Sequence, residues 1–141
     1  MVFKLLGAVT VFACGTLYAL NSERTVEAEL AEAEYLLSVF GYVKDETEEF
    51  DTPLFEILRA RGFDGVETLI SNVKSEGLCA IVSEARSLGR GYKKEELRVC
   101  NHILCNLESA KKSLEAKARE TKAISRVKGL GLAAAAVILL V

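Results

Sequence analysis

The two most apolar stretches of the chain lie at its ends. The first runs from Leu5 to Leu20 without a charged residue, and the second runs from Gly129 to Val141 without a polar one. In both stretches the apolar side chains fall on all sides of a helix, which is typical of a membrane span. The pattern predicts an N-terminal transmembrane helix at residues 1–21 and a C-terminal transmembrane helix at residues 127–141.

The C-terminal stretch is short for a span, and its alternative is a core helix of a small domain. A core helix in so small a domain should keep a polar face, and this stretch has none. Arg126 and Lys128 precede the apolar run. Because long basic side chains can extend their methylene groups through the interface, a short terminal span can be completed from this side.

The N-terminal stretch leaves a second interpretation open. A cleaved signal peptide needs small residues just before the cleavage site, and the end of this run offers an indifferent one. The segment Val11–Cys14 is loosely similar to a lipoprotein cleavage box that would lipidate Cys14, but the bulky Phe12 stands where a small residue is expected. An uncleaved anchor is favoured, and an exported or lipid-anchored helical binding protein is the alternative.

Between the two ends, apolar residues recur at helical spacing, and no alternating strand pattern of convincing length is present. Two apolar stripes predict core faces on the first and last of these helices: Leu30, Ala33, Leu37 and Phe40, then Leu97, Cys100, Leu104, Leu107, Ala110 and Leu114. The fold class is all-α, a bundle of about five helices. It is expected as a cytoplasmic domain at residues 22–126, with helices at about 21–43, 54–61, 64–75, 80–88 and 93–126.

The acidic stretch from Lys44 to Asp51 is predicted as a linker before the second helix. Asp51 or Thr52 is expected to cap that helix, with Pro53 in its first turn, where a missing N–H costs nothing. Gly62 is expected to end it. The only proline of the chain therefore marks a helix start.

Charge changes the picture in two ways. The formal net charge is −2, so a polyanion-binding surface is not expected and nucleic acid is excluded as a partner. Acids dominate residues 23–56 and bases dominate residues 111–128. We therefore predict that the acidic face at residues 27–34 lies beside the basic face at residues 117–126. The bases beside the spans also place the bundle in the cytoplasm by the positive-inside rule.

Candidate chemistry is sparse. The four cysteines form no close-packed disulfide framework, which favours a reduced domain. Cys100, His102 and Cys105 are the only arrangement resembling a metal site, and on a helix they do not share a face well. We expect no metal, no cofactor and no catalytic activity. An enzyme using these three residues is the weaker alternative, and it would require bound metal.

Several short motifs resemble those of the stage III sporulation protein AB family of endospore-forming bacteria. They are Lys4–Val9, the helix start Thr52–Leu58, Arg126–Leu132 and Val137–Leu140, and they occur in the family's order along the whole chain. The resemblance implies a membrane protein of the mother cell that forms part of a transenvelope channel to the forespore. It also implies a helical domain similar to the cytoplasmic domain of the F platform proteins of type II secretion.

By that resemblance the chain would act as a scaffold near a secretion-type ATPase, stage III sporulation protein AA, without a reaction of its own. Other channel components are expected partners, and self-association is left open. We predict that Arg59 and Arg61, two bases on the helix that follows Pro53, belong to a polar surface facing a partner.

Overall fold

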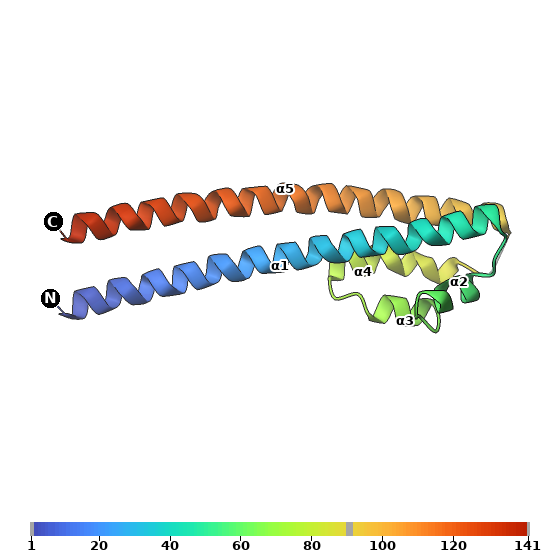
Figure 1. Cartoon of the computed structure of the whole chain (residues 1–141), viewed down its shortest axis with the longest axis horizontal. Coiled ribbons are helices and arrows are strands. Elements are labelled where there is room, and N and C mark those ends of the chain that lie inside the picture. Colours follow the sequence, from blue (N-terminus) through green and yellow to red (C-terminus); the bar gives the residue numbers. More distant parts are fainter. Residues whose placement is uncertain (1, 90–91, 141) are drawn as a thin grey trace. The chain divides into compact units, whose positions relative to one another are not determined.

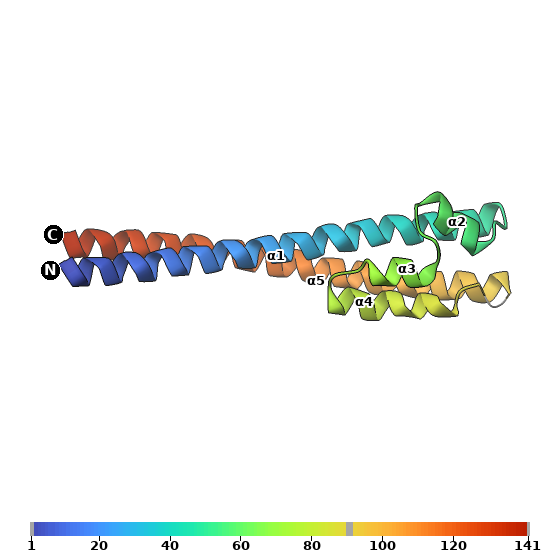
Figure 2. The same cartoon turned by 90° about the horizontal axis from the view of Figure 1, so that it is seen from below.

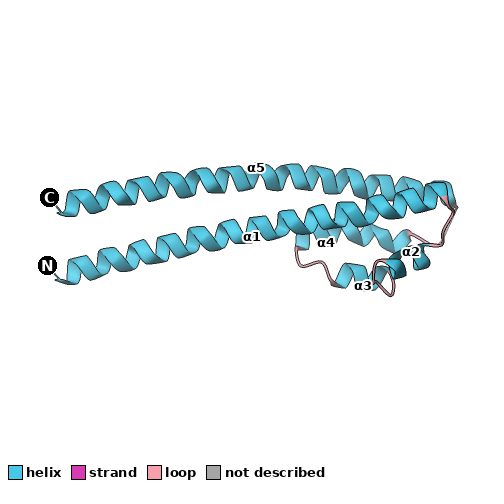
Figure 3. Ribbon diagram, in the orientation of Figure 1, coloured by secondary structure: helices cyan, strands magenta, loops and turns pink. Residues whose placement is uncertain are grey.

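The computed structural model describes residues 2–89 and 92–140, with every side chain in these ranges except those of Lys4, Leu5, Ala133, Ala136, Val137, Leu139 and Leu140. This part of the chain contains no strand, and its helices are joined by short loops (Figures 1 and 3). The prediction of an all-α chain of about five helices is confirmed. The elements are α1 (Val2–Glu49), α2 (Leu54–Ala60), α3 (Val66–Ser71), α4 (Glu76–Val82), the 3-10 helix η1 (Ser83–Ser87) and α5 (Lys93–Leu140).

The chain divides into two compact units. Unit 1 contains residues 1–28 and 114–141, and unit 2 contains residues 29–113. The long helices α1 and α5 contribute to both units and pass from one to the other without a break. In unit 2 the three short α-helices lie along residues 29–49 of α1 and 93–113 of α5 in both views (Figures 1 and 2).

The core of unit 2 is built from apolar residues that recur every three or four positions, the spacing that places them on one face of a helix. Two residues of the stripe predicted on α1, Ala33 and Phe40, are fully buried. Leu30 and Leu37 are only half-buried, because the observed face is turned toward Leu36. The buried apolar residues described in unit 2 are Ala33, Leu36, Val39, Phe40, Val43, Ile57, Leu58, Phe63, Leu69, Ile70, Leu78, Val82, Ala85, Leu88, Cys100, Ile103 and Leu107.

Helix α1 continues to Glu49, so the prediction of a linker at residues 44–51 was wrong for most of that stretch. Val43 and Thr47 are buried one turn apart, which gives the acidic segment an inward face. Glutamate is also a good helix former. The charged side chains are therefore carried on the last turns of a helix, and only residues 50–53 connect it to α2.

The start of α2 also differs from the prediction. Pro53 is the N-cap residue and no side chain caps the helix, so neither Asp51 nor Thr52 plays that role. Asp51 pairs instead with Lys93 at 3.4 Å, and the Thr52 hydroxyl donates to Glu46 Oε2 at 3.4 Å. The end of α2 is as predicted, since Gly62 adopts a positive φ of 84°, where glycine meets no steric penalty.

The two helices predicted at 64–75 and 80–88 have other boundaries. Helix α3 ends at Ser71, and α4 begins early, at Glu76. The cause lies on α1: the Glu32 carboxylate accepts the backbone N–H of Lys74 at 2.7 Å and of Ser75 at 3.1 Å. Lys74 and Ser75 directly precede α4, whose N-cap residue makes no side-chain capping bond, so the carboxylate fixes the chain at the point where it enters the helix. A contact distant in sequence therefore sets where α4 starts.

Unit 1 buries few of its apolar side chains. Phe3 is 92% exposed, and Leu130 and Ile138 are about three-quarters exposed, at 74% and 76%. Among the residues that the structure describes, no helix is both long enough and apolar enough to cross a membrane. The predicted spans at 1–21 and 127–141 lie partly outside the described residues, because Met1 and Val141 and several side chains next to them are not covered.

Candidate functional site

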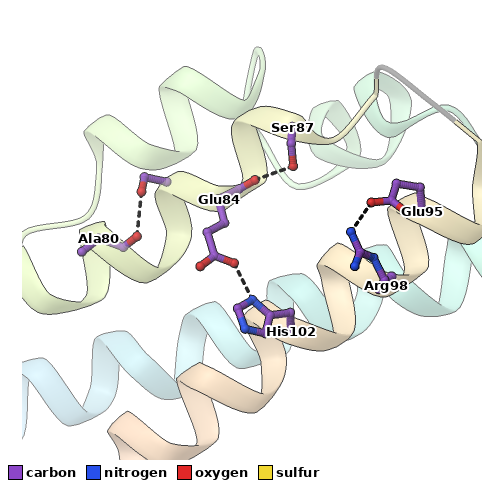
Figure 4. A network of polar contacts seen from close by, with 7 residues as sticks. Ala80, Glu84, Ser87, Glu95, Arg98 and His102 are labelled. Atoms are coloured by element: carbon purple, nitrogen blue, oxygen red, sulfur yellow. Dashed lines mark hydrogen bonds and ion pairs between the residues drawn. The ribbon is translucent and has the colours of Figure 1, made fainter.

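The 3-10 helix η1 and the first turns of α5 form a polar groove in unit 2, with a volume of about 840 Å³. Figure 4 shows Glu84 and His102 of this groove pointing toward one another from the two elements, while Arg98 points to Glu95 on its own helix. Its lining combines two serines, two arginines, a histidine, a glutamate and one apolar residue. These are Ser83, Glu84, Arg86, Ser87, Arg98, Val99 and His102.

Each base of the groove is paired with an acid close by. His102 Nδ1 lies 2.7 Å from Glu84 Oε2, and this pair links η1 to α5 (Figure 4). Arg98 pairs with Glu95 one turn before it on α5. All four of these side chains are substantially exposed, so the pairs are held in contact with water and each contributes little to stability.

Arg86, the second arginine of the groove, binds a residue of α3. Its Nε donates to Glu67 Oε1 at 2.8 Å, and its Nη2 donates to Glu67 Oε2 at 3.3 Å. The hydrogen bond with Glu67, and then the charge of that carboxylate, raise the pKa of the Arg86 guanidinium. This two-pronged contact joins η1 to α3 and leaves Arg86 charged at every physiological pH.

A histidine oriented by a carboxylate is half of a nucleophilic site, and the missing half is an activated hydroxyl or thiol. Ser83 and Ser87 stand nearby, but the Ser83 hydroxyl donates to the Ala80 carbonyl at 2.6 Å and the Ser87 hydroxyl donates to the Glu84 carbonyl at 2.8 Å. Both protons are directed at the backbone, as in Ser contacts that tighten a helical turn. The groove is therefore a surface of paired charges, suited to contacts with another polar surface.

The three residues considered for a metal site are separated by their helical positions. Cys100 is 1% exposed in the core, whereas His102 faces the groove and Cys105 is exposed. Burial, and then the nearby Glu96 carboxylate, raise the pKa of the Cys100 thiol to about 11. Among the described residues no group of three histidine, cysteine or acidic side chains could hold a metal ion. All four cysteines of the chain are free.

Arg59 and Arg61, the residues predicted to face a partner, are both exposed. The Arg59 guanidinium lies 5.7 Å from the centre of the Phe55 ring, and that of Arg61 lies 4.5 Å from the centre of the Tyr42 ring. Both rings add cation–π attraction, which fixes the direction of the two bases. The sequence indicated the bases but not these aromatic contacts, since Tyr42 belongs to a different helix.

One ion pair confirms the predicted pairing of the acidic and basic faces, and a second joins the same two helices outside the predicted basic face. In unit 1, Lys122 Nζ lies 3.3 Å from Glu27 Oε1. In unit 2, Lys111 Nζ lies 3.4 Å from Glu34 Oε1. Lys111 lies outside the basic face predicted at 117–126. Because α1 and α5 run antiparallel, Glu34, which follows Glu27 on α1, meets a residue that precedes Lys122 on α5.

Sequence reasoning missed the polar groove. Glu84 and His102 lie far apart in the sequence, and neither sits in a motif, so no local pattern marks them as a pair. No protein-family model, curated protein or solved structure matches the chain.

Proposed function

We propose that this chain is a membrane-anchored scaffold of a sporulation transenvelope channel, as its resemblance to stage III sporulation protein AB implies. The terminal segments of unit 1 would lie in the mother-cell membrane that faces the forespore, and unit 2 would lie in the cytoplasm. In this role the protein would hold channel components in place and would carry out no reaction of its own.

The observation that carries the proposal is the exposed apolar surface of unit 1. Val2, Phe3, Leu6, Val9, Val11, Phe12, Leu17, Tyr18 and Leu20 are exposed on α1, and Val127, Leu130 and Ile138 are exposed on α5. Removing one large apolar side chain from water is worth about 1.5–3 kcal/mol. So many exposed large apolar side chains in one unit are typical of a contact with a membrane or a partner. A lipid bilayer would satisfy the apolar faces of both segments together.

The partner surface of unit 2 is proposed to include Arg59 and Arg61. Arginine and aromatic residues are enriched where proteins bind one another, and here each guanidinium is already oriented by a ring. An oriented base loses less side-chain freedom when it binds an acid on another protein. The ATPase that the resemblance implies, stage III sporulation protein AA, is the proposed partner for this surface.

Membrane anchoring can be tested with Val11→Arg. An arginine near the centre of a span costs about 2.5–3.5 kcal/mol on insertion scales, so we expect most of the protein to leave the membrane fraction. Tyr35→Arg is the matched control, because Tyr35 is exposed on the same helix but lies in unit 2. Membrane fractionation with an alkaline wash gives the readout. Equal recovery of both variants from the membrane would contradict the anchor.

Partner binding can be tested by co-purification of the full chain with the ATPase from sporulating cells. We expect the double variant with Arg59→Glu and Arg61→Glu to co-purify with little of the ATPase, since the reversed charges would repel acidic residues of the ATPase. Lys94→Glu with Lys112→Glu is the matched control, with the same change in net charge at exposed positions of α5. Full retention by the Arg59 and Arg61 double variant would remove these residues from the partner surface.

The alternative of an exported or lipid-anchored binding protein predicts a different mature N-terminus. Mass spectrometry of the protein isolated from its cells separates the two. An intact Met1 or Val2 excludes a cleaved signal, whereas a lipid on Cys14 excludes the anchor formed by residues 1–21.

A further inference from the structure

We propose that a cleft on α1 in unit 1 binds the headgroup of an anionic phospholipid. The cleft is a shallow, open depression of about 490 Å³ between side chains of this one helix, and it is lined by Leu17, Tyr18, Leu20, Asn21 and Arg24. This inference rests on the proposed membrane anchoring and adds the lipid class that the anchor selects.

The residues of the cleft change from apolar to basic along the helix. Leu17, Asn21 and Arg24 follow one another at intervals of four and three residues, so they lie on one face. Leu17 and Leu20 supply the apolar end, and Arg24 supplies the charged end. A phospholipid has the same order, with acyl chains next to a charged phosphate.

The polar groups of the cleft suit a phosphodiester. Arg24 is exposed and forms no ion pair with any other residue that the structure describes. A guanidinium can bind two phosphate oxygens at once, and the Asn21 amide has N–H groups to donate to a third. Tyr18 carries a phenol on an apolar ring, the type of side chain found at the headgroup level of membranes.

The acids nearest to Arg24 in sequence leave its charge available. Glu27 is engaged by Lys122 of α5, whose Nζ lies 3.3 Å away. Glu23 is the preceding residue, and neighbours in sequence do not face each other on a helix. No described acid therefore pairs with the guanidinium that the cleft presents.

The second segment of unit 1 adds positive charge at the same level. Glu27 lies one turn after Arg24 on α1, and Arg126 lies one turn after Lys122 on α5. Since α1 and α5 run in opposite directions, the Glu27–Lys122 pair sets Arg126 at the height of Arg24. The two arginines would then face the same layer of headgroups, where each base is attracted to an anionic surface.

The apolar half of the cleft argues for a lipid over a free phosphate ion. Inorganic phosphate would use the arginine and the amide and would leave Leu17, Tyr18 and Leu20 in water. A phospholipid would cover these side chains with its glycerol and acyl groups while its phosphate met Arg24. The occupant we propose is therefore a lipid such as phosphatidylglycerol.

The test uses the full chain reconstituted in nanodiscs that contain phosphatidylcholine with a minor fraction of phosphatidylglycerol. After extraction into mild detergent, native mass spectrometry counts the lipids of each class that stay bound. We expect the wild type to retain phosphatidylglycerol in preference to phosphatidylcholine. Arg24→Gln should weaken that preference about fivefold, the factor equivalent to about 1 kcal/mol per base at an anionic surface.

Lys112→Gln is the matched control, because it removes one exposed positive charge from α5 in unit 2. It should leave the lipid preference unchanged, and circular dichroism should show the same helix content for all three proteins. Addition of inorganic phosphate should not displace the lipid. Displacement by phosphate at equal concentration would assign the cleft to a free anion and would overturn the proposal.

Two further outcomes separate this inference from the proposed function. Reconstitution without any preference for phosphatidylglycerol would overturn lipid recognition while leaving the membrane anchor intact. Failure to enter nanodiscs of either lipid would overturn both. An unchanged preference in Arg24→Gln would remove the cleft as the site.

Discussion

Units 1 and 2 use the same two long helices in opposite ways. In unit 2, α1 places Phe40 in a closed core, where its side chain is 1% exposed. In unit 1 the same helix leaves Phe3 and Leu6 exposed, at 92% and 62%. Most large apolar residues of unit 2 pack against others within the chain, whereas most of those described in unit 1 remain exposed to water. Whether an apolar side chain of a helix is buried or exposed therefore depends on what packs against that helix.

The short helices account for this difference. Helices α2, α3 and α4 each contribute two buried apolar residues to unit 2, and η1 contributes Ala85. Unit 1 has no such covering element, because its residues belong to α1 and α5 alone. Two helices side by side can cover only one face of each other. Apolar side chains such as Phe3 and Leu130, on the described parts of these two helices, are therefore left exposed.

The largest contrast is expected from removing one phenylalanine in each unit. Phe40→Ala should destabilise unit 2 by about 3–5 kcal/mol, since it deletes a buried ring and leaves a cavity. Phe3→Ala should leave unfolding unchanged within about 0.5 kcal/mol, as for other exposed positions. Urea unfolding of the full chain in detergent, followed by circular dichroism, measures both. Similar losses in the two variants would mean that unit 1 has a packed core of its own.

Two cysteines allow a second comparison by pH. The folded pKa of Cys100 is about 11, above its ordinary value of 9.0, because burial disfavours the thiolate. The folded state therefore holds the thiol proton more tightly than the unfolded state does. The resulting stabilisation is fully present below the unfolded pKa, and it is lost as the pH rises through the folded pKa. Deprotonation of Cys100 should therefore lower the free energy of unfolding by about 2–3 kcal/mol between about pH 9 and 11.

The matched variants are Cys100→Ala and Cys14→Ala. Cys100→Ala should lose the part of the pH slope that comes from the thiol, whereas Cys14→Ala, at an exposed position of unit 1, should keep it. Thermal unfolding at a series of alkaline pH values gives the slopes. Identical slopes in the two variants would show that Cys100 titrates as it does in the unfolded chain.

The features that could be predicted from the sequence are those that depend on residues close together along the chain. Helix type and helix count follow from apolar spacing, and Gly62 marks the end of α2 as expected. The complementary charge of α1 and α5 predicted the Glu27–Lys122 contact but not the Glu34–Lys111 contact. The start of α4 could not be read locally, since it depends on Glu32 from another helix. The same applies to the groove, whose Glu84–His102 pair forms only after η1 meets α5.

Glu32 itself offers a smaller test. Glu32→Gln keeps the shape of the side chain but removes the charge that strengthens its two bonds at the start of α4, so we expect a loss of about 1–2 kcal/mol. Glu48→Gln is the control, because Glu48 is exposed on the same helix. Hydrogen exchange at the amides of Lys74 and Ser75 should quicken in the first variant only. Unchanged exchange there would mean that the carboxylate does not hold these amides.

The smallest effects should come from the two ion pairs that join α1 to α5. Exposed pairs are worth about 0.2–1 kcal/mol, and both pairs should fall in this range. The Lys111 side chain is 33% exposed, whereas that of Lys122 is 55% exposed, so water screens the pair in unit 2 less. Double-mutant cycles with Glu34→Gln and Lys111→Met, and with Glu27→Gln and Lys122→Met, should therefore give the larger coupling in unit 2. A larger coupling in unit 1 would indicate that the Glu27–Lys122 pair is shielded from water by something outside the chain, as at a membrane surface.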